Sequence, residues 1–150
     1  MKFEKTIKQT KFENSQQKAI LNIFYTSNYL RDIQWGYFKK FDILPQHFNV
    51  LRILRGKHPQ PISPGDIKEV MIDKGNDVTR LVDKLVIMKL VSRELCAENR
   101  RKIDIHITNQ GLKLLEKMDG PLKEAFDSIR KKLTSKEADL LSDLLDKLRT

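Results

Sequence analysis

Apolar residues recur every three or four positions over most of the chain, which is the spacing of one face of an α-helix. The most regular stretch runs from Gly75 to Met88, with apolar residues on one face and polar residues on the other. Similar stripes predict further helices over residues 15–38, 45–56, 64–71, 108–129 and 135–148. The pattern therefore predicts a mainly α-helical protein.

One stretch changes to a period of two. Residues 90–95 and 102–107 carry the alternation of half-buried strands, and a polar turn over residues 96–101 joins them. The helix before this hairpin is itself the second of two short helices separated by a turn that contains Gly75. This order of elements is typical of a winged helix-turn-helix, a fold that binds nucleic acid.

Prolines, glycines and hydroxyl side chains set the predicted boundaries. Three prolines between His58 and Gly65 exclude a helix interior there, because each removes a backbone donor. The Gly120-Pro121 pair predicts a kink or a loose turn within the long helix after the hairpin. Helix N-caps are predicted at Ser15, Ser63 and Thr108, and Ser135 is predicted to open the last helix.

The helices at both ends carry apolar stripes that need a partner, and the simplest partner is a second copy of the chain. We therefore predict a mainly α fold with a small β-hairpin wing. Its winged helix-turn-helix DNA-binding domain is flanked by N- and C-terminal dimerisation helices. In the first long stripe, most of the aromatic side chains are expected to pack in the core: Tyr25, Tyr29, Trp35 and Tyr37. Residues 1–14 are basic and weakly amphipathic, and fraying is their expected fate.

Charge strengthens the nucleic-acid interpretation. The net charge is +9, from 29 basic and 20 acidic residues. Residues 1–44 and 45–107 carry +4 each, whereas residues 108–150 carry only +1. The excess positive charge thus lies in the first two thirds of the chain, and a surplus of this kind attracts polyanions.

Other classes of protein lack support in the sequence. Cys96 is the single cysteine, so neither an intrachain disulfide nor a cysteine-rich zinc site is expected. The three histidines, His47, His58 and His106, form no metal-binding or catalytic pattern, and the chain has no Gly-rich phosphate loop. We expect no enzyme activity, no cofactor and no metal. The longest apolar runs are too short for a membrane helix, so a cytoplasmic protein without a membrane partner is expected.

Two clusters of polar residues are the candidate contacts to double-stranded DNA. On the predicted recognition helix, Arg80 suits guanine or phosphate, Asn76 suits adenine, and Asp77 suits a cytosine amine. At the hairpin tip, the basic residues suit a minor groove or the phosphate backbone. The full candidate set comprises Ser63, Asn76, Asp77, Thr79, Arg80, Lys84, Arg93, Arg100, Arg101 and Lys102.

These segments resemble the MarR family of bacterial winged-helix regulators. The match lies in the residues Val78-Thr79-Arg80-Leu81-Val82-Asp83-Lys84-Leu85, Leu90-Val91-Ser92-Arg93, Asn99-Arg100-Arg101 and Ile107-Thr108-Asn109-Gln110-Gly111, in the family's order and spacing. Upstream, residues 45–51 look like the family's second-helix motif. The resemblance covers roughly residues 15–150.

The resemblance implies a homodimer whose terminal helices, over residues 15–44 and 109–150, interlock, while residues 45–108 form the DNA-binding region. Two recognition helices would then enter successive major grooves of a pseudo-palindromic operator, with Arg101 in a minor groove. Regulators of this kind are usually repressors released by small ligands, often aromatic, or by thiol oxidation. The candidate ligand residues, chosen by location, are Tyr25, Tyr29, Trp35 and His47.

Three positions depart from the family's pattern. Asn99 stands where the wing usually has an aspartate that orients the arginine, so either the neighbouring Glu98 takes over this role or the wing binds DNA more loosely. Lys89 occupies the usual glycine position after the recognition helix, where a left-handed backbone is easier for glycine, so the end of that helix is expected to differ in shape. Residues 1–44 lack the cysteine of oxidation-sensing members, and Cys96 at the wing base is expected to be inert.

The alternative function is a winged-helix module for protein interaction without specific DNA binding. The coincidence of Arg80, Arg93, Arg100 and Arg101 on one predicted face favours DNA. The sequence does not identify the operator, the target genes or a ligand, and it does not distinguish a repressor from an activator.

Overall fold

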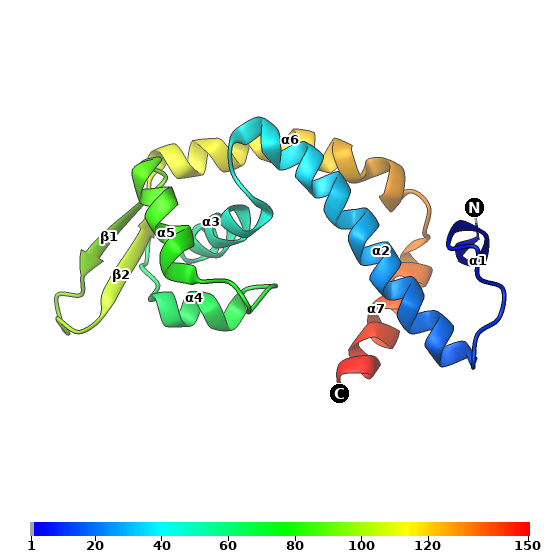
Figure 1. The fold of residues 1–150 in the computed structure, drawn as a ribbon. Coiled ribbons are helices and arrows are strands. Elements are labelled where there is room, and N and C mark those ends of the chain that lie inside the picture. Colours follow the sequence, from blue (N-terminus) through cyan, green and yellow to red (C-terminus); the bar gives the residue numbers. More distant parts are fainter. Residues whose placement is uncertain (1) are drawn as a thin grey trace. The chain divides into compact units, whose positions relative to one another are not determined.

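The computed structural model describes residues 2–150 as two compact units, one up to Pro45 and one from Gln46 to Thr150. The first unit holds two α-helices and a 3-10 helix; the second begins within the next helix and holds the hairpin (Figure 1). The mainly α fold with a β-hairpin wing is therefore confirmed. The elements are α1 (Phe3–Thr6), α2 (Ser15–Phe38), η1 (Lys39–Phe41), α3 (Pro45–Lys57), α4 (Pro64–Val70), α5 (Val78–Ile87), β1 (Val91–Leu95), β2 (Ile103–Ile107), α6 (Asn109–Arg130) and α7 (Ser135–Arg149).

The first unit is built on α2, which begins and ends close to the predicted residues. The predicted cap at Ser15 is wrong by one position. Asn14 is the N-cap, and its Oδ1 accepts a hydrogen bond from the backbone N–H of Gln17 at 2.7 Å. Asparagine is among the best capping residues, because its short amide reaches the free N–H groups of the first turn.

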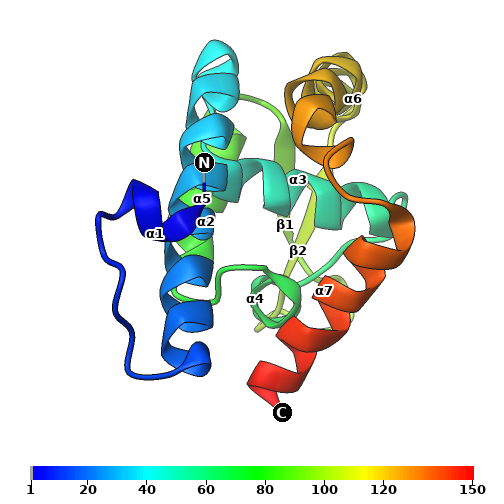
Figure 2. The same ribbon diagram turned by 90° about the vertical axis from the view of Figure 1, so that its right-hand side faces the viewer.

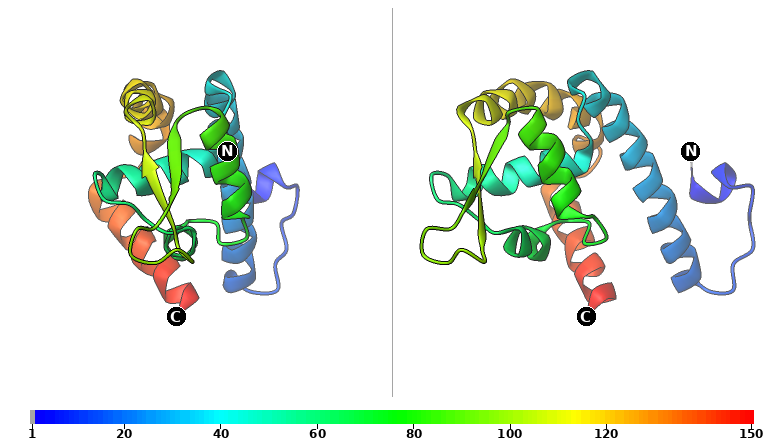
Figure 3. Two further views of the ribbon diagram at one scale, coloured as in Figure 1. Left: turned by 90° about the vertical axis from the view of Figure 1, so that its left-hand side faces the viewer. Right: turned by 60° about the vertical axis from the view of Figure 1, so that its left-hand side comes forward.

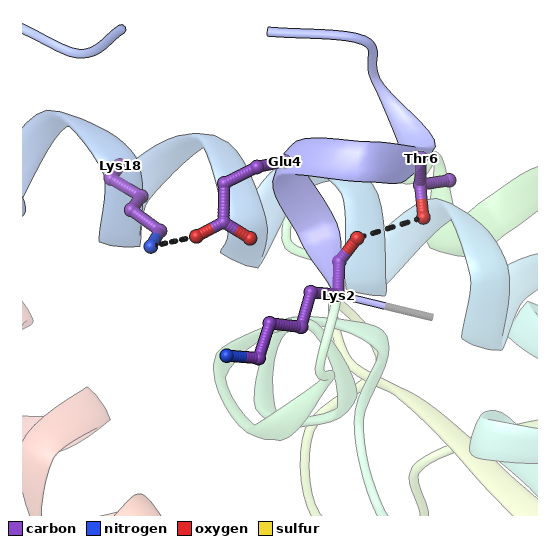
Figure 4. Close-up of polar contacts among 4 residues, drawn as sticks. All are labelled: Lys2, Glu4, Thr6 and Lys18. Atoms are coloured by element: carbon purple, nitrogen blue, oxygen red, sulfur yellow. Dashed lines mark hydrogen bonds and ion pairs between the residues drawn. The ribbon is translucent and has the colours of Figure 1, made fainter. Parts of the chain in front are cut away.

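The N-terminal segment is held against α2 in place of the expected fraying. The ring of Phe3 stacks on Phe12 and lies 5.9 Å from the ring of Tyr25, measured between centroids. Glu4 forms an ion pair with Lys18 (Figure 4). The Lys18 ammonium also lies over the ring of Phe12. The hydrogen bond from Lys18 lowers the pKa of Glu4. A short apolar cluster and one ion pair therefore order this segment.

The aromatic residues of α2 differ in burial. Tyr37 is buried, with its ring edge-on to Phe38 at 5.0 Å. Tyr25, Tyr29 and Trp35 are 43–46% exposed, so the expectation that most of these side chains lie in the core is wrong for this chain.

The second unit has a core made by α3, α4, α5, the hairpin and the first half of α6. β1 and β2 pair antiparallel from Val91–Ile107 to Leu95–Ile103. Ile62 pairs with Ile105 on the other edge of β2, with hydrogen bonds of 3.1 Å in both directions. The hairpin tip extends away from the helices (Figures 1 and 3). The most deeply buried side chains are Val50, Leu51, Leu54, Ile67, Val82, Leu85, Ile105, Leu115 and Met118.

The end of α5 has the shape expected for glycine although Lys89 stands there. Lys89 is left-handed, with φ of 60°. Its N–H donates to the carbonyl of Val86, and the N–H of Leu90 donates to the carbonyl of Leu85, both at 2.9 Å. These two bonds form the Schellman motif that usually places glycine at this position. The lysine therefore keeps the geometry and carries its steric cost.

Thr108 joins the end of the hairpin to the end of α5. Its hydroxyl donates to the carbonyl of Lys89 at 2.8 Å and accepts from the N–H of Gly111 at 3.1 Å, which confirms the predicted N-cap. A side chain at Gly111 would place its Cβ 2.3 Å from the carbonyl oxygen of Leu90. This close approach requires glycine at the start of α6.

The two C-terminal helices differ in how much they bury. α6 continues through Gly120 and Pro121, so the predicted loose turn is wrong, and its buried residues are Gly111, Leu115 and Met118. α7 is a separate helix after a short turn (Figure 2). Its N-cap is Thr134, one residue before the predicted start, and forms a reciprocal capping box with Glu137. α7 contains no buried residue.

Candidate nucleic-acid interface

The polar residues at the start of α5 mostly serve the local fold. Asp77 is the N-cap, and its Oδ1 accepts from the N–H of Arg80 at 3.3 Å. The amide nitrogen of Asn76 donates to the carbonyl of Asp73 at 3.1 Å. One polar atom of each side chain, Oδ1 of Asp77 and Nδ2 of Asn76, is therefore engaged in the cap and the turn, and the assignment of both residues to DNA bases stays a prediction.

Two predicted contacts remain open on α5. Thr79 and Arg80 are exposed and lie in the first turn of the helix. Within residues 2–150, the Arg80 guanidinium forms no ion pair. Lys84 lies one turn further on and is half-buried. The exposed cation on α5 is thus Arg80, at the end of the helix that a helix-turn-helix places against base edges.

Arg93 lies on β1, the first strand of the wing, and its side chain contacts α5. Its Nη1 lies 2.5 Å from Oδ1 of Asp83 on α5. Both side chains are partly exposed, at 38% and 47%. This ion pair connects the recognition helix to the first strand of the hairpin. Sequence reasoning assigned Arg93 to DNA and did not assign Asp83, because nothing in their spacing reveals a contact between a helix and a strand.

The wing tip is organised by Asn99 through the backbone. Its Oδ1 accepts from the N–H of Arg101 at 3.1 Å, and its carbonyl accepts from the N–H of Lys102 at 2.8 Å. The N–H of Cys96 donates to the carbonyl of Lys102 at 2.9 Å and closes the base of the turn. Asn99 therefore fixes the main chain beside Arg101, whereas the resemblance assigned this position to orienting the guanidinium.

The basic side chains of the wing tip favour a polyanionic partner. Arg100, Arg101 and Lys102 are exposed, and in the part of the chain that the structure describes they form no ion pair. Three neighbouring cations without acidic partners create a positive potential at the tip. The arrangement combines free guanidinium groups on α5 and on the wing, with the Asp83–Arg93 ion pair between these elements.

Ser63 takes the predicted capping position at the start of α4. Its hydroxyl oxygen accepts from the N–H of Asp66 at 3.2 Å, and the hydroxyl donates to the Asp66 carboxylate at 2.7 Å. The hydroxyl is thus engaged in the helix start, and its assignment to DNA stays a prediction.

The candidate ligand residues have different environments. Tyr25 contacts Phe3, whereas Tyr29 and Trp35 are about half exposed. His47 on α3 is only 4% exposed. The assignment of these four residues to a ligand site stays a prediction. Among residues 2–150 no group of three or more acidic, histidine or cysteine side chains is placed to hold a metal ion.

Solved structures decide the family. No protein-family model matches the chain. A crystal structure of a MarR transcription factor from Planctomyces limnophilus is 30% identical, covering 91% of this chain and 98% of that protein, with a TM-score of 0.71. The chain belongs to the MarR family of transcription regulators.

Two further MarR-family structures contain DNA. A cysteine-to-serine mutant of MarR from E. coli, solved with operator DNA, is 26% identical over 87% of this chain and 93% of that protein, with a TM-score of 0.74. A complex of MepR from S. aureus with DNA is 22% identical over 92% of this chain and 97% of that protein, with a TM-score of 0.74. At that identity the MepR likeness shows the fold alone. These structural neighbours are regulators and not enzymes.

In this MarR-family chain, no described helix is long and apolar enough to cross a membrane.

Proposed function

We propose that the protein is a homodimeric, sequence-specific DNA-binding transcription regulator that acts as a repressor. The single observation that carries the proposal is the pair of free basic positions on α5 and the wing, Arg80 and Arg101, on elements joined by the Asp83–Arg93 ion pair. An α-helix fits the major groove, and an extended basic hairpin fits the neighbouring minor groove or backbone. DNA in the complex of the 26% identical MarR supports the same partner.

The dimer is supported by the unburied apolar surface of α7. Leu140, Leu141, Leu144 and Leu148 are 47–59% exposed, and they recur at helical spacing. An apolar stripe of this kind is typical of an interface between subunits. Residues 15–44 and 109–150 are therefore the proposed dimerisation regions, and residues 45–108 are the proposed DNA-binding region.

A dimer would place two copies of α5 on a pseudo-palindromic operator. The proposal includes relief of repression by a small aromatic ligand, because regulators of the MarR family are usually released by small ligands, which are often aromatic. Tyr25, Tyr29, Trp35 and His47 are its candidate residues. Titration of the protein with small aromatic acids, followed by the fluorescence of Trp35, would test ligand binding separately from DNA binding.

Gel-shift titration of duplex DNA from upstream of the coding sequence tests the proposal against a protein-interaction module. The Arg80→Ala/Arg101→Ala double variant should bind at least about a hundredfold more weakly, since it loses one contact in each groove. Lys147→Ala/Arg149→Ala, which removes two cations from α7, is the matched control and should bind normally. Equal binding by wild-type protein and the first double variant would favour the interaction module.

Sedimentation tests the dimer independently. Leu141→Glu/Leu144→Glu should dissociate the protein to monomers, because carboxylates cannot be buried unpaired in the interface. Ile87→Glu changes a residue that is 81% exposed on α5 and should leave the dimer intact.

A further inference from the structure

The last pair of residues in the hairpin ladder is apolar and exposed. Leu95 on β1 lies directly opposite Ile103 on β2, and their side chains are 69% and 36% exposed. Opposed residues in an antiparallel pair point to the same face, so the two side chains are neighbours. They lie on the face that also carries Val91 and Ile107, which are buried. The hairpin face that packs in the core at Val91 and Ile107 thus extends to Leu95 and Ile103, where the other elements cover it less.

The covering stops at Ile105. That residue is buried and pairs with Ile62 on the free edge of β2. In the described part of the chain, no further bridge is formed towards the tip, which extends away from the helices (Figures 1 and 3). Leu95 and the exposed third of Ile103 therefore present apolar surface that the fold itself does not cover.

The opposite face of the hairpin is acidic at the same level. Glu94 and Asp104 are directly opposed in the register. Like charges in this relation repel each other and also repel a phosphate backbone. An approaching polyanion is therefore disfavoured on this face and is directed to the face of Leu95 and Ile103.

Basic residues adjoin the apolar pair. Lys102 directly precedes Ile103, and Arg100 and Arg101 complete the tip, all three exposed. The exposed Glu98 lies in the same turn, so the three basic residues less one acidic residue leave residues 98–102 with a net charge of +2. The surface therefore offers apolar contact beside a tip of net positive charge. A groove of duplex DNA has the matching chemistry, because its walls are apolar deoxyribose edges between anionic phosphates.

We propose that Leu95 and Ile103 contact the deoxyribose edges of the DNA minor groove beside the wing arginines. This inference rests on the proposed DNA-binding function and adds an uncharged contact to it. The contact provides affinity that does not depend on salt, since apolar burial releases no counterions. It also favours sequences whose minor groove fits the apolar pair.

The test compares salt dependence between variants. Leu95→Thr/Ile103→Thr places β-branched threonine, a good strand former, at both positions but removes much of the apolar surface. We expect its DNA affinity to fall about tenfold at every salt concentration, with an unchanged slope of log K against log salt. Arg101→Ala should instead reduce the slope.

Two further measurements separate a DNA contact from hairpin stability or from another occupant. Leu95→Met/Ile103→Val keeps the apolar surface and should retain full affinity. Amide hydrogen exchange of the hairpin should be similar in the threonine and wild-type proteins. Faster exchange together with weaker binding would assign the pair to hairpin stability and would overturn the proposed contact.

Other outcomes are equally decisive. If wild-type protein binds DNA and the threonine variant binds equally well, the proposed contact of Leu95 and Ile103 with DNA is wrong, and the proposed DNA-binding function is unaffected. If the threonine variant instead loses a protein partner or self-association, the apolar pair is a protein contact. A wild-type protein without salt-dependent DNA binding would overturn the proposed function and the contact together.

Discussion

Asp83 on α5 and Arg93 on β1 form an ion pair with 2.5 Å between Oδ1 and Nη1. The pair adds a side-chain contact between α5 and the wing, the two elements proposed to enter adjacent grooves. Because both side chains are more than a third exposed, the contribution of this pair to stability is small. We therefore predict that its loss affects DNA binding, through the relative placement of α5 and β1, more than it affects folding.

A double-mutant cycle checks this conclusion. Asp83→Asn, Arg93→Gln and the double variant should give a coupling free energy of about 0.2–1 kcal/mol in unfolding, as exposed pairs do. The ratio of specific to non-specific DNA affinity should fall more than the stability does, because the wing loses its fixed position. A coupling energy of several kcal/mol with an unchanged affinity ratio would contradict a geometric role.

Lys89→Gly should stabilise the protein. The left-handed backbone at this position is strained for lysine and unstrained for glycine, while glycine loses more backbone entropy on folding. The net gain should be about 0.5–1 kcal/mol in urea unfolding. Lys89→Ala removes the charge and keeps the Cβ, so it should give no comparable gain. Equal stabilisation by alanine would mean that charge, and not backbone strain, sets the effect.

Gly111 of α6 and Gly36 of α2 should respond in opposite directions to alanine. At Gly111 the new Cβ would meet the Leu90 carbonyl oxygen at 2.3 Å, so the backbone must move, and the loss should exceed about 2 kcal/mol. At Gly36, beyond its chain neighbours and its own helix backbone, nothing lies within 4 Å of the new Cβ, and a gain of about 0.5–1 kcal/mol is expected from helix propensity. Thermal unfolding of both variants measures the difference. A mild effect at Gly111 would show that the contact relaxes easily.

The attachment of the N-terminal segment should depend on pH through Glu4. The hydrogen bond and charge of Lys18 lower the pKa of Glu4 below the ordinary value of 4.5. The stabilising contribution is therefore fully present above about that pH and is lost as the pH falls through the lowered pKa of the folded state. NMR shifts of Phe3 and Tyr25 should follow this loss, and Glu4→Gln should abolish it. A transition that persists in Glu4→Gln would assign the pH response to another group.

The sequence was most informative where structure depends on near neighbours. Thr108 and Ser63 cap the predicted helices, because capping requires only a hydroxyl beside the first turn. The same local chemistry acts at Asn76 and Asp77, whose side chains also satisfy backbone groups of the turn and the cap, and their assignment to bases stays a prediction.

Contacts between distant residues were not predictable. The Asp83–Arg93 ion pair depends on how the hairpin folds back along α5, and no local spacing specifies that arrangement. The exposure of Leu95 was likewise not predictable from the sequence. Alternation identifies which residues share a face of a strand, but it does not show how far along the strand that face is covered by the core. The acceptance of a left-handed backbone by Lys89 also depends on the surrounding packing.

The salt dependence of binding tests the central claim most directly. Wild-type protein should be titrated on duplex DNA from upstream of its own coding sequence over a range of salt concentrations. The account predicts that log K falls linearly with log salt, with a slope steeper than about −4, because Arg80, the wing cations and their symmetry mates displace counterions from phosphates. A slope near zero, or no binding at low salt, would contradict the claim.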